Sequence, residues 1–157
     1  MGTDPRARLK IEGLLPGLGG SRWEVTSDDD PSYNCVGWAL GDAEHWWEPV
    51  RPMRWPEGVP REDTVEAYLA VFAIAGFTAC DTADPEPGFE KVVIYGEQSG
   101  FTHAARQLPD GTWTSKLGAL EDIEHDDPRS LEGSCFGRVV AFLRRPVAAV
   151  DPRSAST

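Results

Sequence analysis

The stretch THAARQLPDGTWTSKL, residues 102–117, decides the fold. It contains two runs suited to β-strands, 102–108 and 112–117, on either side of a Pro-Asp-Gly turn. Apolar alternation around such a turn is a strong signal for a β-hairpin. The second half of the chain is therefore predicted to contain an antiparallel sheet.

The turn sets the register of this hairpin. A two-residue turn at Asp110 and Gly111 divides the side chains into a core face and a less apolar face, because successive residues of a strand point to opposite sides. With that turn, the core face contains Ala104, Leu108, Trp113 and Leu117, and the other face contains His103, Ala105, Gln107, Thr114 and Lys116.

Two further strands and two helices are expected outside the hairpin. The apolar runs KVVIY (91–95) and GRVVAFL (137–143) have the length and composition of core strands. Helices that precede an antiparallel sheet are the order of an α+β fold. The sequence therefore predicts the α+β class.

The two helices lie upstream of these strands. The segment SDDDPS (27–32) supplies a cap, acidic residues and a proline, so the first helix should begin near residues 31–32 and continue to about Trp46. The second helix should follow Thr64 and stop at Gly76. The proline-rich connection between the helices is predicted to be irregular.

The chain has 157 residues, of which 40% are hydrophobic and six are Trp, enough for the core of one domain. Residues 1–20, rich in Gly and Pro, are expected to form an N-terminal arm, residues 21–146 a single domain, and residues 147–157 a flexible tail.

The charge and the cysteines restrict the partners and the compartment. A net charge of −11 repels nucleic-acid phosphates and anionic lipids, so nucleic-acid and membrane binding are excluded as functions. No apolar run approaches the roughly 20 residues that span a bilayer, and no secretory signal is recognised. Three widely spaced cysteines make a poor disulfide framework, and we expect a cytoplasmic protein.

Cys35 is the strongest candidate for a nucleophile. It lies in the first turns of the first predicted helix, where aligned peptide dipoles favour the thiolate that attacks carbonyl carbon. Asn34, together with Gln107 and Lys116, is a candidate for contacting the substrate or its oxyanion. The alternative is that Cys35 is a small buried hydrophobe.

His103 is the candidate base. It opens the hairpin on the less apolar face, where a helix that carries Cys35 could lie across it. An imidazole in that position takes the thiol proton and returns it to a leaving group. The alternative is a histidine that only satisfies a local hydrogen bond.

A third polar group should orient the imidazole. We prefer His125 or Asp122, because either side chain can accept a hydrogen bond from the ring. The register of the hairpin instead favours three closer residues, Gln107, Thr114 and Lys116.

Four segments are similar to those of a little-characterised bacterial family: YNCVGWALG (33–41), FEKVVIYG (89–96), THAARQLPDGTWTSKLG (102–118) and DIEH (122–125). A cysteine at a helix start, followed by an antiparallel sheet whose early strand begins with histidine, also resembles the papain-like cysteine hydrolase superfamily. Its compact bacterial amidases and endopeptidases are the nearest in shape, and the resemblance spans roughly residues 32–145.

The resemblance implies a papain-like fold in which Cys35 is the nucleophile and His103 the base. The reaction would cleave or transfer amide or ester bonds of a peptide or protein substrate through an acyl-enzyme, without a cofactor. The third polar residue of the superfamily has no unambiguous counterpart, and the acidic chain has no export signal. An intracellular amidase, deamidase, acyltransferase or toxin-type effector therefore fits better than a cell-wall enzyme.

Three alternatives remain open. A permuted arrangement would pair His103 with Cys135. A metal site could gather the cysteines and histidines, but no pair has the short spacing of zinc ligands, so no metal is expected. A binding or assembly module without catalysis would use the Trp- and Pro-rich segment 46–56 as a recognition surface for a protein partner. The same segment is otherwise explained as a loop that covers the core.

Overall fold

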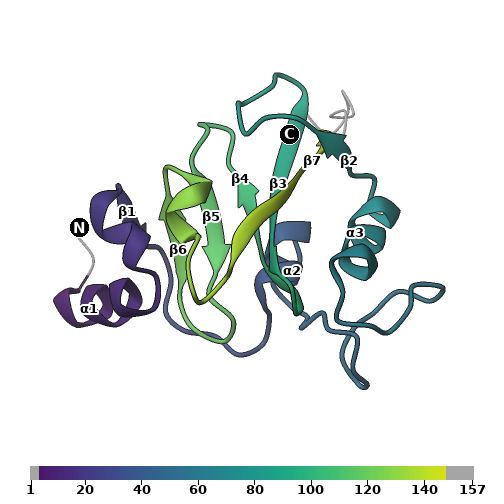
Figure 1. Ribbon diagram of the computed structural model, residues 1–157, viewed down its shortest axis with the longest axis horizontal. Helices are drawn as coiled ribbons and strands as arrows, with labels where there is room; N and C mark the ends of the chain where they lie inside the picture. The colour runs from purple at the N-terminus through teal and green to yellow at the C-terminus, as the bar shows by residue number, and fades with distance from the viewer. Residues whose placement is uncertain (1–3, 148–157) are drawn as a thin grey trace, which may run out of the picture.

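The computed structural model describes residues 4–147, which form one seven-stranded antiparallel sheet with helices on both faces (Figure 1). The strand order is β1-β6-β5-β4-β3-β7-β2. The predicted α+β class is confirmed. The strands are β1 (Trp23–Val25), β2 (Thr78–Cys80), β3 (Phe89–Glu97), β4 (Gly100–Gln107), β5 (Trp113–Lys116), β6 (Asp122–His125) and β7 (Arg138–Pro146).

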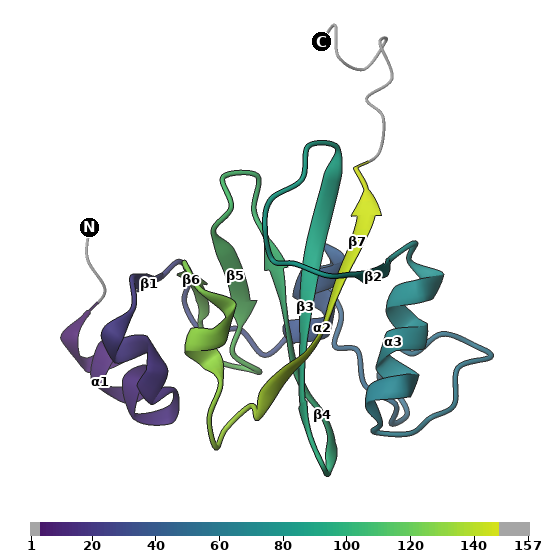
Figure 2. The same ribbon diagram turned by 45° about the horizontal axis from the view of Figure 1, so that its top comes forward.

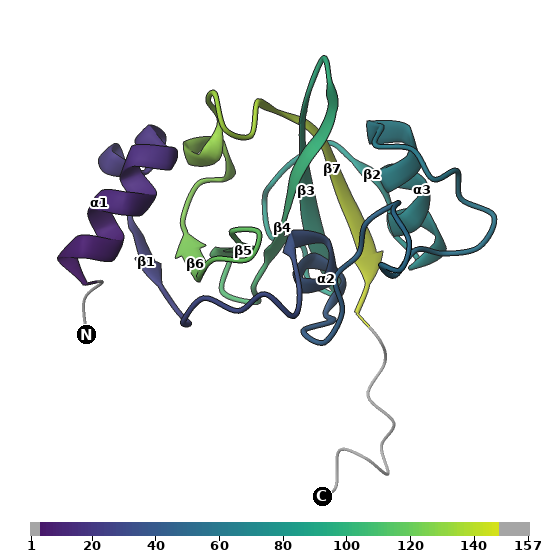
Figure 3. The same ribbon diagram turned by 90° about the horizontal axis from the view of Figure 1, so that it is seen from below.

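The helices cover the two faces of the sheet separately, and Figure 3 shows α2 and η2 on opposite sides of the strands. The helices are α1 (Pro5–Leu14), α2 (Cys35–Leu40) and α3 (Val65–Ile74), with the 3-10 helices η1 (Pro16–Gly20) and η2 (Pro128–Leu131). Within residues 4–147, no helix has both the length and the apolar character needed to cross a bilayer.

Each face has its own apolar core. The core of what we call the α2 face includes Cys35, Val36, Ala39, Tyr68, Val71, Phe72, Val92, Ile94, Ala104 and Leu143. The core of the opposite face, which we call the α1 face, includes Ile11, Leu18, Trp23, Val93, Tyr95, Ala105, Trp113, Ile123 and Leu131.

Strands β3 and β7 are the two longest strands and pair along their length, and the strands predicted at residues 91–95 and 137–143 are both present, although Leu143 is the only buried residue of β7. Successive residues of β3 are fully buried on alternating sides, with Ile94 in the core of the α2 face and Tyr95 in that of the α1 face. A continuous apolar run is the pattern expected of a strand covered on both faces.

Within the predicted arm, residues 5–14 and 16–20 are helical and pack on the sheet. Asp4 caps α1 by accepting a hydrogen bond from the backbone of Arg6, and a proline occupies the first turn. Ile11 and Leu18 have no exposed surface, so this segment contributes to the core of the α1 face. Figure 2 shows α1 and α3 at opposite ends of the molecule. Of the predicted tail, residues 148–157 lie outside the described residues.

The second predicted helix is confirmed, whereas the first is shorter than predicted. Thr64 caps α3, which ends two residues before Gly76. Helix α2 begins at Cys35 rather than near Pro31, because the side chain of Asn34 is its cap, and it ends where Gly41 adopts a left-handed conformation with φ of 87°.

The predicted register of the β4–β5 hairpin is wrong by one residue. Gln107 lies opposite Trp113 and Arg106 opposite Thr114, because the turn is longer than two residues. The carbonyl of Leu108 accepts a hydrogen bond from the backbone N–H of Gly111. Gly111 itself has a φ of 91°, in the left-handed region. Because of one extra residue in the turn, the side chains of β5 that were predicted to share a face with a given set of β4 side chains lie on the opposite face.

Candidate functional site

The sheet divides the predicted site residues into two groups. Cys35 belongs to the core of the α2 face, together with Ala104 of β4. His103 precedes Ala104 in the same strand and contacts Tyr95 and Phe136 on the α1 face. The prediction that a helix carrying Cys35 lies across His103 is therefore wrong, because α2 packs on the face of Ala104, whereas the side chain of His103 points to the other face.

Cys35 is the first residue of α2 and is only 8% exposed. Burial raises the pKa of its thiol to about 11, although hydrogen bonding to the backbone of Ala104 and the charge of Lys116 act in the other direction. A thiol with this pKa is almost entirely protonated at neutral pH. The helix start alone does not produce a thiolate here, because α2 is short and the sulfur is desolvated.

Lys116 and Asp122 lie on the same face as Cys35, but they are engaged locally. The ammonium of Lys116 donates to the carbonyls of Asp30 and Gly118, both at 2.6 Å, and burial lowers its pKa. Asp122 Oδ2 accepts a hydrogen bond from the hydroxyl of Tyr33 at 2.8 Å, and its Oδ1 is buried without a partner among the described residues. Neither side chain has a hydrogen bond to Cys35 within residues 4–147.

Asn34 is occupied by a structural role. Its Oδ1 accepts from the backbone N–H of Gly37 at 3.2 Å and of Trp47 at 3.1 Å, and its Nδ2 donates to the carbonyl of Trp47 at 2.8 Å. The side chain thus caps α2 and fastens the segment that follows the helix. These three hydrogen bonds leave little capacity for an oxyanion.

We expect Asn34→Ala to destabilise the fold by about 2 kcal/mol, because it removes a helix cap and leaves buried backbone groups unpaired. Asn34→Asp should cost less, since a carboxylate still accepts from Gly37 and Trp47. Urea unfolding of both variants measures the difference. Equal stability of Asn34→Ala and the unaltered chain would contradict this role.

His103 and His125 form a buried chain of hydrogen bonds through Ser115. The Ser115 hydroxyl lies 3.0 Å from Nε2 of His103 and 2.8 Å from Nε2 of His125. Nδ1 of His125 lies 3.3 Å from the carbonyl of Asp127, which can only accept. This network assigns the proton of His125 to Nδ1, so Ser115 donates to His125 and accepts from His103.

Burial keeps both imidazoles neutral. It lowers the pKa of His103 to about 3 and that of His125 to about 4. The ring of Phe136 stacks on His103 with a centroid distance of 4.1 Å. Ser115, which joins the two histidines, was missed in the sequence, although correct alternation from Trp113 would have placed it beside them.

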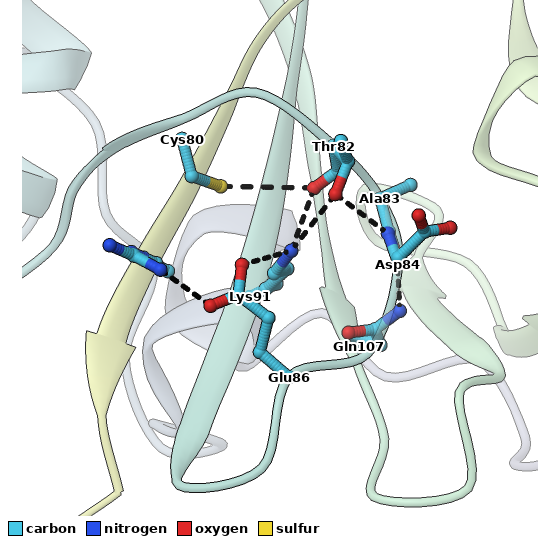
Figure 4. Close-up of polar contacts among 8 residues, drawn as sticks. Cys80, Thr82, Ala83, Asp84, Glu86, Lys91 and Gln107 are labelled. Carbon is cyan, nitrogen blue, oxygen red and sulfur yellow. Dashed lines mark hydrogen bonds and ion pairs between the residues drawn. The ribbon is translucent and has the colours of Figure 1, made fainter.

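Gln107 lies on the α1 face and holds a loop rather than a substrate. Its Nε2 donates to the carbonyl of Ala83 at 2.7 Å, in the segment that crosses the end of the sheet between β2 and β3 (Figure 4). The same segment is held by the buried Lys91, whose ammonium lies 2.9 Å from the carbonyl of Thr82 and from Glu86.

The Trp- and Pro-rich segment 46–56 has a buried base and an exposed tip. Trp55 is 7% exposed and its indole N–H lies 3.2 Å from the carbonyls of Val59 and Pro60. The tip leaves Val50 58% exposed and Met53 39% exposed. Figures 1 and 2 show the connection between α2 and α3 extending away from the sheet, on the side far from α1.

The base of this segment is fixed by backbone hydrogen bonds. Arg54 donates to the carbonyl of Trp46 at 3.0 Å, and Glu48 donates to the carbonyl of Arg54 at 3.2 Å. The guanidinium of Arg54 lies 5.3 Å from the ring centroid of Trp47. The tip is therefore an exposed turn on an ordered support.

An apolar groove of about 310 Å³ borders this segment, between α2 and α3. We call it the α2–α3 groove, and it includes the exposed side chain of Ile74. Its lining is Leu40, Gly41, Asp42, Trp47, Pro56, Val71, Ile74 and Ala75.

The remaining cysteines and histidine are not assembled into a second site. Cys80 is half-buried in β2, and the exposed Cys135 adjoins Phe136 without a hydrogen bond to His103 within the described chain. His45 lies 2.8 Å from a carboxylate oxygen of Asp42. Among residues 4–147, no three His, Cys, Asp or Glu side chains are grouped as metal ligands.

The sheet is also the unit on which the chain matches a known family. A domain of unknown function, DUF7689, matches residues 24–144, well over half of the chain. The chain belongs to the DUF7689 family. The match begins in β1 and ends in β7, so the DUF7689 domain spans all seven strands. No curated protein and no solved structure matches the chain.

Proposed function

We propose that this DUF7689 domain is a binding module, with the tip of segment 46–56 and the adjoining α2–α3 groove as its recognition surface. The observation that carries the proposal is the exposed apolar and basic tip, held on a hydrogen-bonded base beside an apolar groove. Exposed apolar side chains on an ordered support favour binding, because little conformational freedom is lost when a partner is engaged.

The chemistry of the surface suggests the kind of partner. Arg51 and Arg54 are exposed on the tip and have no ion pair within residues 4–147, in a chain with a net charge of −11. The groove is lined mainly by apolar side chains. A protein segment that offers an apolar side chain to the groove and a carboxylate to the tip would complement both features.

The hydrolase hypothesis has less support than the binding hypothesis. Cys35 and His103 lie on opposite faces of the sheet and are both buried, so no thiolate–imidazole pair is available to a substrate. A papain-like relationship remains compatible with the cysteine at the start of a helix on an antiparallel sheet. In this proposal, the domain retains that arrangement without its catalytic pair. Three unpaired cysteines favour a cytoplasmic location.

The binding proposal is tested by photo-crosslinking from Met53. A photoreactive amino acid at this position, in cells that make the protein naturally, should crosslink a discrete partner, which is then purified. Met53→Asp and Ile74→Asp should each weaken binding of that purified partner by at least about tenfold, since each puts a charge into an apolar contact.

Leu9→Asp is the matched control, because Leu9 is 77% exposed on α1, at the other end of the molecule. It should leave the affinity unchanged. The proposal fails if no partner is crosslinked, or if the Met53 and Ile74 variants bind as tightly as the control. Circular dichroism establishes that each variant is folded before its affinity is compared.

A further inference from the structure

We propose that a cleft at one end of the sheet binds a carboxylate group through Arg106. The cleft has a volume of about 490 Å³ and lies where β3 begins and β4 ends. We call it the end cleft. Its lining is largely apolar, with Pro85, Pro87, Phe89, Leu108, Pro109 and Val147. This site is independent of the tip and groove proposed above.

Arg106 lines the end cleft without an ion pair in the described residues, although the nearby carboxylate of Glu90 acts to raise its pKa. Within residues 4–147 it makes no hydrogen bond and no ion pair, and its Nε is buried without an acceptor. The guanidinium lies over the ring of Trp38, 4.9 Å from the centroid. Stacking fixes the plane of the guanidinium, and its two terminal Nη groups can bind a carboxylate with two parallel hydrogen bonds.

The two acidic residues of the end cleft are already neutralised. Glu86 pairs with both Lys91 and Arg144, and Glu90 pairs with Arg145. Arg106 is the cation of the cleft lining, and it has no ion pair within residues 4–147, in a chain of net charge −11. Because Glu86 and Glu90 already have cationic partners, a carboxylate that enters the cleft can pair with the guanidinium of Arg106.

The lining narrows the class of ligand. Prolines and a phenylalanine favour an apolar body attached to the carboxylate, as in an aromatic acid or the C-terminus of a peptide that ends in an apolar residue. Burial of the guanidinium lowers the pKa of Arg106, which nevertheless remains fully charged. Both ligands carry a carboxylate on an apolar body, and the experiment below distinguishes the small acid from the peptide C-terminus.

Sodium benzoate is the first probe, titrated into ¹⁵N-labelled protein. The Nε–H resonance of Arg106 and the indole N–H resonance of Trp38 should shift and saturate, whereas neutral benzamide should cause no comparable shift. Arg106→Gln should weaken benzoate binding by about tenfold or more, because a charge-assisted pair is lost. Arg138→Gln, the same change of charge at an exposed site on β7, should bind benzoate as the unaltered protein does.

Two peptides that end in Phe, one with a free carboxylate and one amidated, identify the source. Tighter binding of the free peptide than of benzoate supports the proposal with a peptide ligand, and the reverse order supports it with a small acid. Equal binding of benzoate and benzamide would overturn it, as would unchanged affinity in folded Arg106→Gln. The benzamide comparison uses the unaltered protein and does not depend on a variant that folds.

Discussion

Cys35 of the folded DUF7689 domain will react with iodoacetamide at pH 7 at least about a hundredfold more slowly than the same cysteine in the unfolded chain. The reason is its protonation. Burial raises the pKa of the thiol to about 11, whereas a free thiol has a pKa of about 8.5. Only the thiolate is alkylated, and its fraction at pH 7 differs by roughly this factor, before any steric protection is counted.

Mass spectrometry of each cysteine during the reaction measures this ratio, with urea-unfolded protein as the reference. The exposed Cys135 serves as an internal control that the reagent is active. His103→Ala should leave the rate at Cys35 unchanged in the folded protein, because the imidazole lies on the other face of the sheet. Fast alkylation of Cys35 that depends on His103 would instead restore the hydrolase hypothesis and exclude the arrangement described here.

Acidification from pH 7 to pH 5 will remove roughly 4 kcal/mol of stability through the two buried histidines. Folding holds the pKa of His103 at about 3 and that of His125 at about 4, compared with 6.5 for an ordinary histidine. Above pH 6.5 both states are neutral at these positions and nothing is lost. Below pH 6.5 the two histidines bind protons in the unfolded chain but not in the folded chain. The free energy of unfolding therefore decreases as the pH is lowered, until the folded pKa values are reached.

Urea unfolding at a series of pH values gives this slope. His103→Gln removes one of the two titrating groups and should reduce the histidine contribution to the slope by about half. His45→Gln is the matched control, because His45 is exposed. The carboxylates other than Asp42 titrate alike in all three proteins and cancel in the comparison, whereas His45→Gln also removes one of the partners that lower the pKa of Asp42. Identical slopes for His103→Gln and His45→Gln would contradict the assignment.

Elements with strong local signals could be predicted from the sequence. Thr64 accepts from the third residue of α3, which is the geometry its side chain favours at a helix start, and the helix ends close to Gly76. The apolar run in β3 is long enough to be a core strand whichever way it faces. In both cases the local preference agrees with the tertiary environment.

Short elements could not be predicted in this way. Strands β1, β2 and β6 have three or four residues each, too few for alternation to stand out from the surrounding sequence. Asp122 and His125 lie in strand β6, where the sequence predicted no strand. Its pairing with β5 depends on tertiary contacts that the local sequence does not encode.

The candidate site shows how one residue in a turn changes a functional hypothesis. All the residues on which the hydrolase hypothesis depends are buried in the structure, but the turn around Gly111 contains one residue more than was assumed. That residue puts Ser115, rather than Thr114 and Lys116, on the face of His103, whereas the separation from Cys35 arises because α2 packs on the other face. Alternation in the sequence shows which residues of one strand share a face. It shows which residues of two neighbouring strands share a face only when the length of the turn between them is known.

The position of β7 has a consequence for the time at which the domain can fold. β7 is the last of the described strands in chain order, yet it lies between β3 and β2 in the sheet. While a ribosome makes the chain, β3, β4, β5 and β6 can pair in succession as they emerge. Until residues 138–146 have been synthesised, one edge of β3 is unpaired and β2 has no strand with which to pair. The nascent domain therefore passes through a stage with an apolar, unpaired strand edge, which is the kind of surface that chaperones cover.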